Sequence, residues 1–219
     1  MALPFMAALV YFVWLGDHPA ARIAYGLTKA FTLVWPLVAV LWIIRERLPR
    51  PGIGDVFNAR VCVTGIISGA LIAAAILLLM NTVIGDIVAG NSENILSKIV
   101  AFGLTEHYLA FAVFLSLIHS LIEEYYWRWF VYGRLRQLIR SHYAHILAGV
   151  AFASHHIVIA SQFFPILWAV VLGSCVALGG MIWSMMYERQ KTITGAWISH
   201  MIVDLSIMAI GYQLVFLPS

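Results

Sequence analysis

Long apolar runs separated by short polar stretches dominate the sequence. A helix that crosses a bilayer needs about 20 consecutive apolar residues, and seven runs reach or approach that length. They cover residues 2–15, 23–44, 61–84, 105–133, 145–161, 164–187 and 193–216. The polar stretch DIVAGNSENILSK, at 86–98, predicts a short helix at the membrane interface. The pattern therefore predicts an all-α, polytopic transmembrane bundle of about seven spans.

The first run, residues 2–15, also has the apolar character of a secretory signal peptide. Such a peptide has basic residues before its apolar core, and none precedes this run. We therefore expect a membrane segment here. Because the run is short for a full span, we expect it to be tilted or partly interfacial.

The composition supports a membrane protein. Of the 219 residues, 63% are hydrophobic and 11% are charged. Soluble domains are about half apolar and about a quarter charged. The net charge of +3 does not indicate nucleic acid, because the basic residues lie in the predicted loops. Cys62 and Cys175 lie within apolar runs, which predicts two small buried side chains and no disulfide.

The basic residues predict the orientation of the chain in the membrane. Lys and Arg gather in cytoplasmic loops, and three alternate loops hold most of them here, while the opposite loops hold little more than Arg22 and Lys98. We therefore expect a cytoplasmic N-terminus and an external C-terminus. The basic residues of the three predicted cytoplasmic loops are Arg45, Arg47, Arg50, Arg60, Arg134, Arg136, Arg140, Arg189 and Lys191.

Ionisable residues also lie inside three of the predicted spans. At 1.5 Å per residue, Glu123, His156 and His200 lie roughly 13 to 20 Å along their helices from the predicted cytoplasmic ends. Burying such groups in a membrane is costly, and they usually mark a function. Three helices thus bring ionisable side chains to similar depths, which predicts a functional site.

Two adjacent glutamates have different expected roles. Glu124 and Arg128 are one helical turn apart, so they share a face and can pair. Glu123 points about 100° away from Glu124 around the helix. Glu123 is therefore expected to face the bundle interior.

Three short motifs carry a resemblance to a known family. They are EEYYWR at 123–128, FASHH at 152–156 and HMIVD at 200–204. In this order they match EExxxR, FxxxH and HxxxN or HxxxD, and the chain resembles the CAAX protease and bacteriocin-processing (CPBP or Abi) family of glutamic intramembrane proteases. The resemblance covers roughly residues 100–210. We accordingly divide one membrane domain into N-terminal helices, 1–99, and a catalytic core, 100–219.

The resemblance implies hydrolysis of a peptide bond inside the membrane, without a covalent intermediate. Glu123 would be the general base that activates water, and His156 would help to hold that water. His200 and Asp204 would stabilise the oxyanion. Fixed donors at a developing charge supply much of the rate in such reactions. The residues expected to support this site structurally are Glu124, Arg128 and Phe152.

Two details of the motifs need a physical interpretation. The family often has asparagine where this chain has Asp204, and an ionised carboxylate cannot donate a hydrogen bond to an oxyanion. Asp204 is then either protonated or, as we prefer, fixes the tautomer of His200 and favours its charged form. Adjacent His155 and His156 are not expected to face one site together, and the motif spacing favours His156.

Zinc is an alternative to a bare glutamate. Glu123, His156, His200 and Asp204 together form a possible zinc ligand set. No HExxH motif of the usual zinc proteases occurs in the sequence. The resemblance also favours a mechanism without metal, so we expect no cofactor.

A non-proteolytic membrane protein is a second alternative, in the form of an immunity factor, a scaffold or a proton-coupled transporter with the same buried acids. A transporter is expected to contain repeated halves, and none is visible. An inactive scaffold would not need three complete motifs. We therefore expect a protease whose partners are the lipid bilayer and a membrane-associated protein or peptide, cleaved for example in its C-terminal tail, and not nucleic acid. Short loops and the lack of a targeting signal favour a prokaryotic cell membrane.

Overall fold

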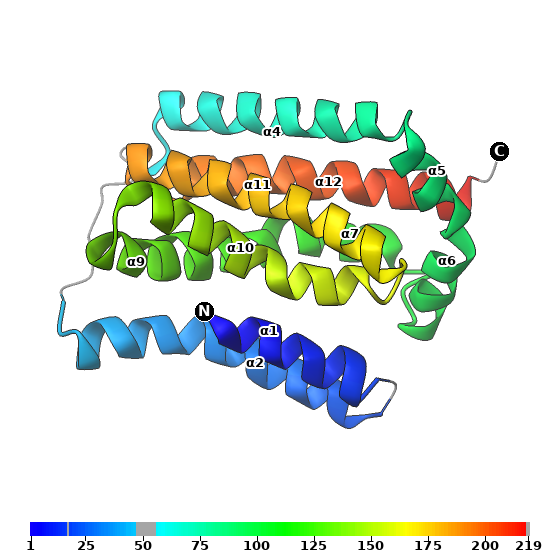
Figure 1. Cartoon of the computed structure of the whole chain (residues 1–219), viewed down its shortest axis with the longest axis horizontal. Helices are drawn as coiled ribbons and strands as arrows, with labels where there is room; N and C mark the ends of the chain where they lie inside the picture. Colours follow the sequence, from blue (N-terminus) through cyan, green and yellow to red (C-terminus); the bar gives the residue numbers. More distant parts are fainter. Residues whose placement is uncertain (17, 47–55, 218–219) are drawn as a thin grey trace. The chain divides into compact units, whose positions relative to one another are not determined.

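The computed structural model describes residues 1–16, 18–46 and 56–217, and all regular structure in these residues is helical (Figure 1). Six of its helices are long and apolar enough to cross a membrane, and the first apolar helix, Ala2–Trp14, is shorter. The prediction of an all-α, multi-pass membrane protein is confirmed, with six candidate spans and one short helix. The six are Ala20–Ile43, Ala59–Leu79, Tyr108–Leu138, Ser141–Ala160, Ile166–Gln190 and Thr194–Phe216.

Several of these helices contain stretches of wider, π-type turns, which carry their own labels. The first short helix is α1 (Ala2–Ala8) with η1 (Leu9–Trp14), followed by α2 (Ala20–Val38) with η2 (Ala39–Ile43). The helix that carries the two glutamates consists of α7 (Tyr108–Phe114), η3 (Leu115–His119), α8 (Ser120–Glu124), η4 (Tyr125–Tyr132) and α9 (Gly133–Leu138). The remaining helices are α4 (Ala59–Leu79), α5 (Val83–Gly90), α6 (Ser92–Ala101), α10 (Ser141–Ala160), α11 (Ile166–Gln190) and α12 (Thr194–Phe216).

The polar stretch at 86–98 forms parts of two short helices, α5 and α6, where one was expected. Its place at a membrane interface stays a prediction. So does the orientation of the chain, and two of the arginines that support it, Arg47 and Arg50, lie outside the described residues.

Contacts divide the chain into two units that are interleaved along the sequence. The first consists of Met1–Phe57 and Ile122–Ile193, and the second of Asn58–Leu121 and Thr194–Ser219. The division at residue 99, made from the motifs, stays a prediction. Each unit is described by itself below.

In the first unit, α10 and α11 pack closely through glycine. A Cβ atom added to Gly149 of α10 would lie 2.7 Å from the carbonyl oxygen of Ala177 of α11, closer than such atoms approach. Small residues of this kind allow helices to approach each other in membranes. The N-terminal helix belongs to the same unit, since Ala8 and Tyr11 form an apolar cluster with Val158 of α10. The short first helix is thus packed against the helix that carries the FxxxH motif.

In the second unit, α4 and α12 pack in the same way. A Cβ atom on Gly65 would lie 2.7 Å from the carbonyl oxygen of Gly195. Side chains also tie the helix that begins at Tyr108 to α12. The Tyr108 hydroxyl donates to the Met208 carbonyl at 2.9 Å, and Trp197 Nε1 donates to the Leu117 carbonyl at 2.9 Å.

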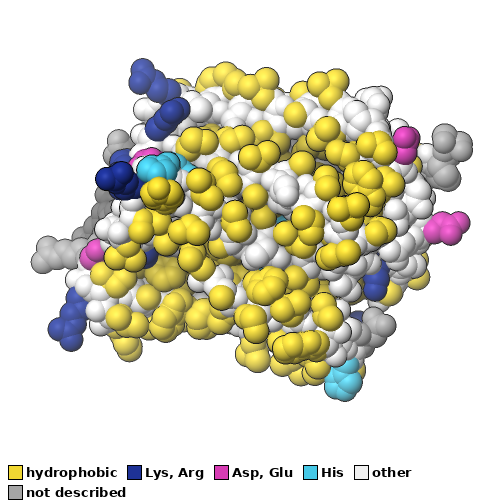
Figure 2. All heavy atoms as spheres, in the orientation of Figure 1, with side chains coloured by type: hydrophobic (Ala, Val, Ile, Leu, Met, Phe, Trp, Pro, Cys, Tyr) yellow, Lys and Arg dark blue, Asp and Glu magenta, His cyan; other side chains and the backbone are white. Residues whose placement is uncertain are grey.

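Apolar side chains are widely exposed on the surface of the described residues. The face shown in Figure 2 is largely hydrophobic, and Leu71, Leu78 and Leu167 are among the exposed leucines. Soluble proteins rarely expose large contiguous apolar patches, so this surface fits contact with lipid. Cys175 is exposed and Cys62 partly exposed, and both are free thiols. The expected absence of a disulfide between them is confirmed, but the prediction that they are buried is wrong, because an apolar helix can turn a small residue toward lipid.

Candidate active site

The arginine of the EExxxR motif lies in a closed cage. Its Nε lies 3.2 Å from Oε2 of Glu124, and both side chains are essentially inaccessible. The contact has the geometry of an ion pair and not of an aligned hydrogen bond. The Arg128 guanidinium carbon lies 4.4 Å from the ring centre of Phe152 and 5.1 Å from that of Trp183. Nη2 donates to the Gly180 carbonyl at 3.4 Å.

This cage explains why the first two motifs occur together. Phe152 begins the FxxxH motif on α10, and its ring lies under the arginine of the EExxxR motif. A buried ion pair is tolerated only when further contacts compensate for lost hydration, and aromatic rings stabilise a cation over their faces. Gly180 leaves the necessary space, because a Cβ atom there would lie 3.1 Å from Phe152 and 3.3 Å from Arg128.

The other glutamate, Glu123, faces two histidines of α10. It is 5% exposed, and its Oε1 lies 3.3 Å from His155 Nε2. Its Oε2 lies 4.0 Å from His156 Nε2. The prediction that the adjacent histidines do not face one site together is therefore wrong. The physical reason is that a carboxylate has two oxygens, so a group placed between two side chains about 100° apart can reach both.

Each histidine is oriented by a second contact. The His155 ring is stacked on Trp127, with ring centres 5.6 Å apart and planes within 3°. His156 Nδ1 lies 3.0 Å from the Phe152 carbonyl oxygen. A carbonyl only accepts, so Nδ1 carries the proton and, in the neutral ring, Nε2 is an acceptor. The side of His156 that faces Glu123 is therefore able to accept a hydrogen bond from water.

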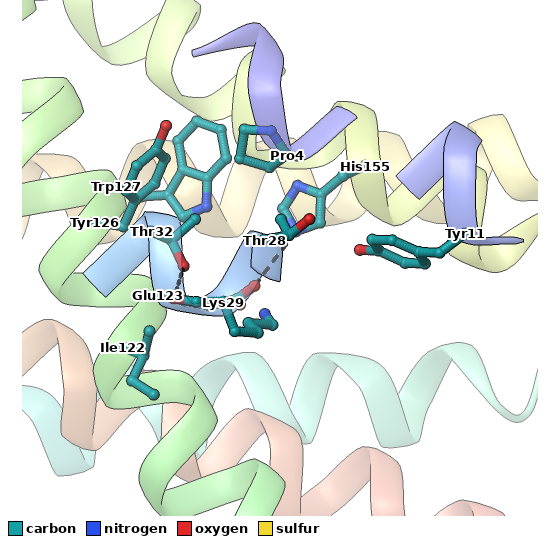
Figure 3. A pocket seen from close by; sticks show the side chains of 10 residues that line it. All are labelled: Pro4, Tyr11, Thr28, Lys29, Thr32, Ile122, Glu123, Tyr126, Trp127 and His155. Carbon is teal, nitrogen blue, oxygen red and sulfur yellow. Dashed lines mark hydrogen bonds and ion pairs between the residues drawn. The ribbon is translucent and has the colours of Figure 1, made fainter. Parts of the chain in front are cut away.

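A small cavity opens beside this group, as Figure 3 shows. Its volume is about 20 Å³, enough for about one water molecule. Glu123, Tyr126, Trp127 and His155 line one part of it, and Ile122 lies beside them. The remaining lining residues come from the N-terminal helices and are Pro4, Tyr11, Thr28, Lys29 and Thr32.

None of these N-terminal residues was expected from the sequence, because the motifs lie after residue 95. The sequence did contain one indication that the N-terminal helices contribute to the site. Lys29 is a lysine inside the predicted span 23–44, and a charged residue in a span usually marks a function.

Glu123, His155 and His156 are also a chemically plausible metal-binding set. Each offers one ligand atom, and the three atoms lie within 4.8 Å of one another. Nitrogen and carboxylate oxygen are ligands that zinc accepts. This set includes His155 and differs from the four residues expected from the sequence. Lys29 lines the same cavity as Glu123 and His155.

The residues of the third motif lie in the second unit. His200 is 3% exposed on α12, and its Nε2 lies 3.5 Å from Oδ1 of Asp204 one turn later. The predicted pairing within the HxxxD motif is thus present. The structure brings together Glu123, His155 and His156 in one unit, and His200 with Asp204 in the other.

These features define a class: a polytopic helical membrane protein with a buried glutamate between two histidines. Residues 105–206 match the model of the type II CAAX prenyl endopeptidase Rce1-like family. This segment contains all three motifs and is similar to that family, which confirms the predicted resemblance to the CPBP family. At the level of the family, this match supports an intramembrane endopeptidase. No curated protein and no solved structure matches the chain.

Proposed function

We propose that the protein hydrolyses a peptide bond of a membrane-associated protein or peptide, with Glu123 as the general base that activates water. One observation carries this proposal. Glu123 is buried between His155 and His156, beside a cavity that has room for about one water molecule. A positioned carboxylate can take a proton from water as the water attacks.

We place the reacting water between Glu123 and His156. The Glu123 carboxylate and Nε2 of neutral His156 are both acceptors, 4.0 Å apart. A water molecule that donates one hydrogen to each keeps its oxygen lone pairs for the substrate. As the oxygen bonds to the carbonyl carbon, Glu123 takes a proton. The carbon–nitrogen bond then breaks, and the proton passes to the leaving amine.

On the basis of the HxxxD motif, we propose that His200 and Asp204 stabilise the oxyanion that forms during hydrolysis. Their contact at 3.5 Å supports the second of the two roles considered for Asp204. A carboxylate beside His200 favours the charged imidazolium, and an imidazolium can donate to the oxyanion. In this scheme Asp204 acts through His200.

We propose that this reaction needs no metal or other cofactor. The alternative that a specific observation favours is zinc held by Glu123, His155 and His156, because these residues offer three suitable ligand atoms. Bound there, zinc would supply an acidic water. The proposal without metal is supported by Lys29, a basic residue that lines the same cavity.

The substrate proposal follows from the name of the matched family, which refers to prenylated CAAX tails. We propose a substrate with a membrane-anchored C-terminal tail, cleaved within a prokaryotic cell membrane, and no nucleic acid partner. The test uses purified protein in lipid nanodiscs and a quenched fluorescent peptide with a farnesylated cysteine and three following residues. Cleavage by the wild type that is lost in Glu123→Gln supports the proposal. Absence of cleavage by the wild type would instead favour a scaffold or immunity factor.

A further inference from the structure

The N-terminal helices form part of the cavity wall, although they lie outside the family-matched residues 105–206. Five of the ten residues that line the cavity come from α1, η1 and α2. Of these five, Lys29 is the residue with a basic side chain. Its presence beside a buried carboxylate calls for a physical explanation.

Contacts within the first unit hold Lys29 at the cavity. Its Nζ lies 5.4 Å from the ring centre of Tyr25, one turn earlier on α2. The Tyr25 ring packs edge to face with that of Tyr11, with centres 5.4 Å apart. Lys29 and Glu123 line the same cavity. Figure 3 shows Tyr11, Lys29, Glu123 and His155 around the same space.

Burying a lysine in a membrane-spanning helix costs free energy. A favourable interaction at the cavity must therefore offset this cost. An uncompensated carboxylate in an apolar cavity is also costly, and an opposite charge nearby offsets that cost. Arg128 cannot take this role alone, because it is engaged with Glu124. Lys29 therefore supplies the positive charge on the N-terminal side of Glu123.

A second observation concerns metal ions. Glu123, His155 and His156 offer three ligand atoms within 4.8 Å, an arrangement that attracts zinc. Lys29 lines the same cavity as Glu123 and His155, and like charges repel strongly at short range in a medium of low dielectric constant. The same charge that stabilises the carboxylate thus opposes metal binding.

We propose that Lys29 takes the electrostatic place of a metal ion beside Glu123. As a positioning residue, it directs the carboxylate toward the cavity for proton abstraction, and it excludes divalent cations from Glu123, His155 and His156. The N-terminal helices are then part of the catalytic machinery. This inference rests on the proposed function of Glu123 as the base.

The test compares Lys29→Met, which removes the charge and shortens the unbranched side chain by one atom, with Lys29→Arg, which keeps the charge. Lys98→Met, on α6 and outside the cavity, is the matched control. Two quantities are measured in nanodiscs: kcat and KM for the quenched prenylated peptide, and the affinity for Zn²⁺ by titration calorimetry.

In Lys29→Met, we expect kcat to fall by about tenfold or more with KM changed by less than about threefold. We expect Zn²⁺ to bind at least about tenfold more tightly than to the wild type. Lys29→Arg and Lys98→Met should resemble the wild type in both measurements. Adding His155→Ala to Lys29→Met should remove the gained zinc affinity, because it removes a ligand.

The inference requires that Lys29→Met both lowers kcat and raises the affinity for Zn²⁺. If only one of these two changes is observed, the inference is overturned. It is also overturned if the gained zinc affinity survives His155→Ala. If Lys29→Met does not fold, Lys29→Gln is measured with the same expectations. An inactive Glu123→Gln together with an unchanged Lys29→Met would refute this inference and leave the proposed function intact. A fully active Glu123→Gln would refute the proposed function itself.

Discussion

Glu124 and Arg128 form an ion pair one helical turn apart, with 3.2 Å between Oε2 and Nε and neither side chain more than 1% exposed. The adjacent Glu123 faces His155 and His156. Two neighbouring acids therefore have separable roles. Glu124 pairs with the arginine that contacts α10 and α11, and Glu123 lines the cavity.

The first prediction concerns stability. Glu124→Ala leaves the buried guanidinium of Arg128 without its carboxylate, so the free energy of unfolding should fall by about 3–5 kcal/mol. Glu123→Gln keeps the size and shape of its side chain and should change stability little. Thermal unfolding of both variants in nanodiscs is the measurement. Equal melting temperatures for the two variants would contradict the structural role of Glu124.

A second prediction concerns the space beside the arginine cage. Gly180→Ala adds a Cβ atom 3.1 Å from Phe152 and 3.3 Å from Arg128, and overpacking of this kind costs about 1–3 kcal/mol. The neighbouring Gly179 is the matched control, since its added Cβ would come no closer than 3.7 Å to Trp183. Gly179→Ala should therefore leave the melting temperature unchanged or raise it. A similar loss of stability in both variants would argue against the close packing at Gly180.

The third prediction concerns the base. Glu123→Gln removes basicity, so cleavage of the quenched peptide should fall by at least about a hundredfold, the scale of a general base. Its amount in the membrane should stay near that of the wild type. Glu106→Gln, near the start of the same helix, is a control that should cleave normally. Near-normal cleavage by Glu123→Gln would show that Glu123 is not the general base.

Much of the fold was predictable because membrane helices depend on local composition. The apolar runs predicted the helices at 23–44, 145–161 and 193–216 to within a few residues of Ala20–Ile43, Ser141–Ala160 and Thr194–Phe216. The pairing of Glu124 with Arg128 was also predictable, because it depends on spacing within one helix. The first run was the least certain span, and it forms the short helix Ala2–Trp14.

The contacts between helices were not predictable in the same way. Spacing within α10 cannot show that Glu123 lies between His155 and His156, because that depends on how another helix packs against α10. Lys29 was missed for the same reason. It is far from the motifs in sequence, and only the packing of α2 in the first unit brings it to the cavity of Glu123.

The last prediction separates the bare glutamate from zinc. If zinc were held by Glu123, His155 and His156, these ligands would act as one unit. Removing any of them or stripping the metal would abolish activity, and added zinc would restore the stripped enzyme. We expect the other pattern, in which a strong chelator leaves cleavage intact, because Lys29 supplies the positive charge beside Glu123.

Variants of the third motif, HxxxD, test the glutamate scheme in a second way. In the glutamate scheme, His200→Ala removes a donor to the oxyanion and should lower kcat by about a hundred- to a thousandfold. Asp204→Asn converts the site to the other motif form and should retain activity, because an amide can also donate a hydrogen bond.

Metal analysis of wild-type protein purified without added zinc completes the experiment. Stoichiometric zinc, together with a chelator-induced loss of cleavage that zinc restores, would overturn the glutamate scheme in favour of the metal.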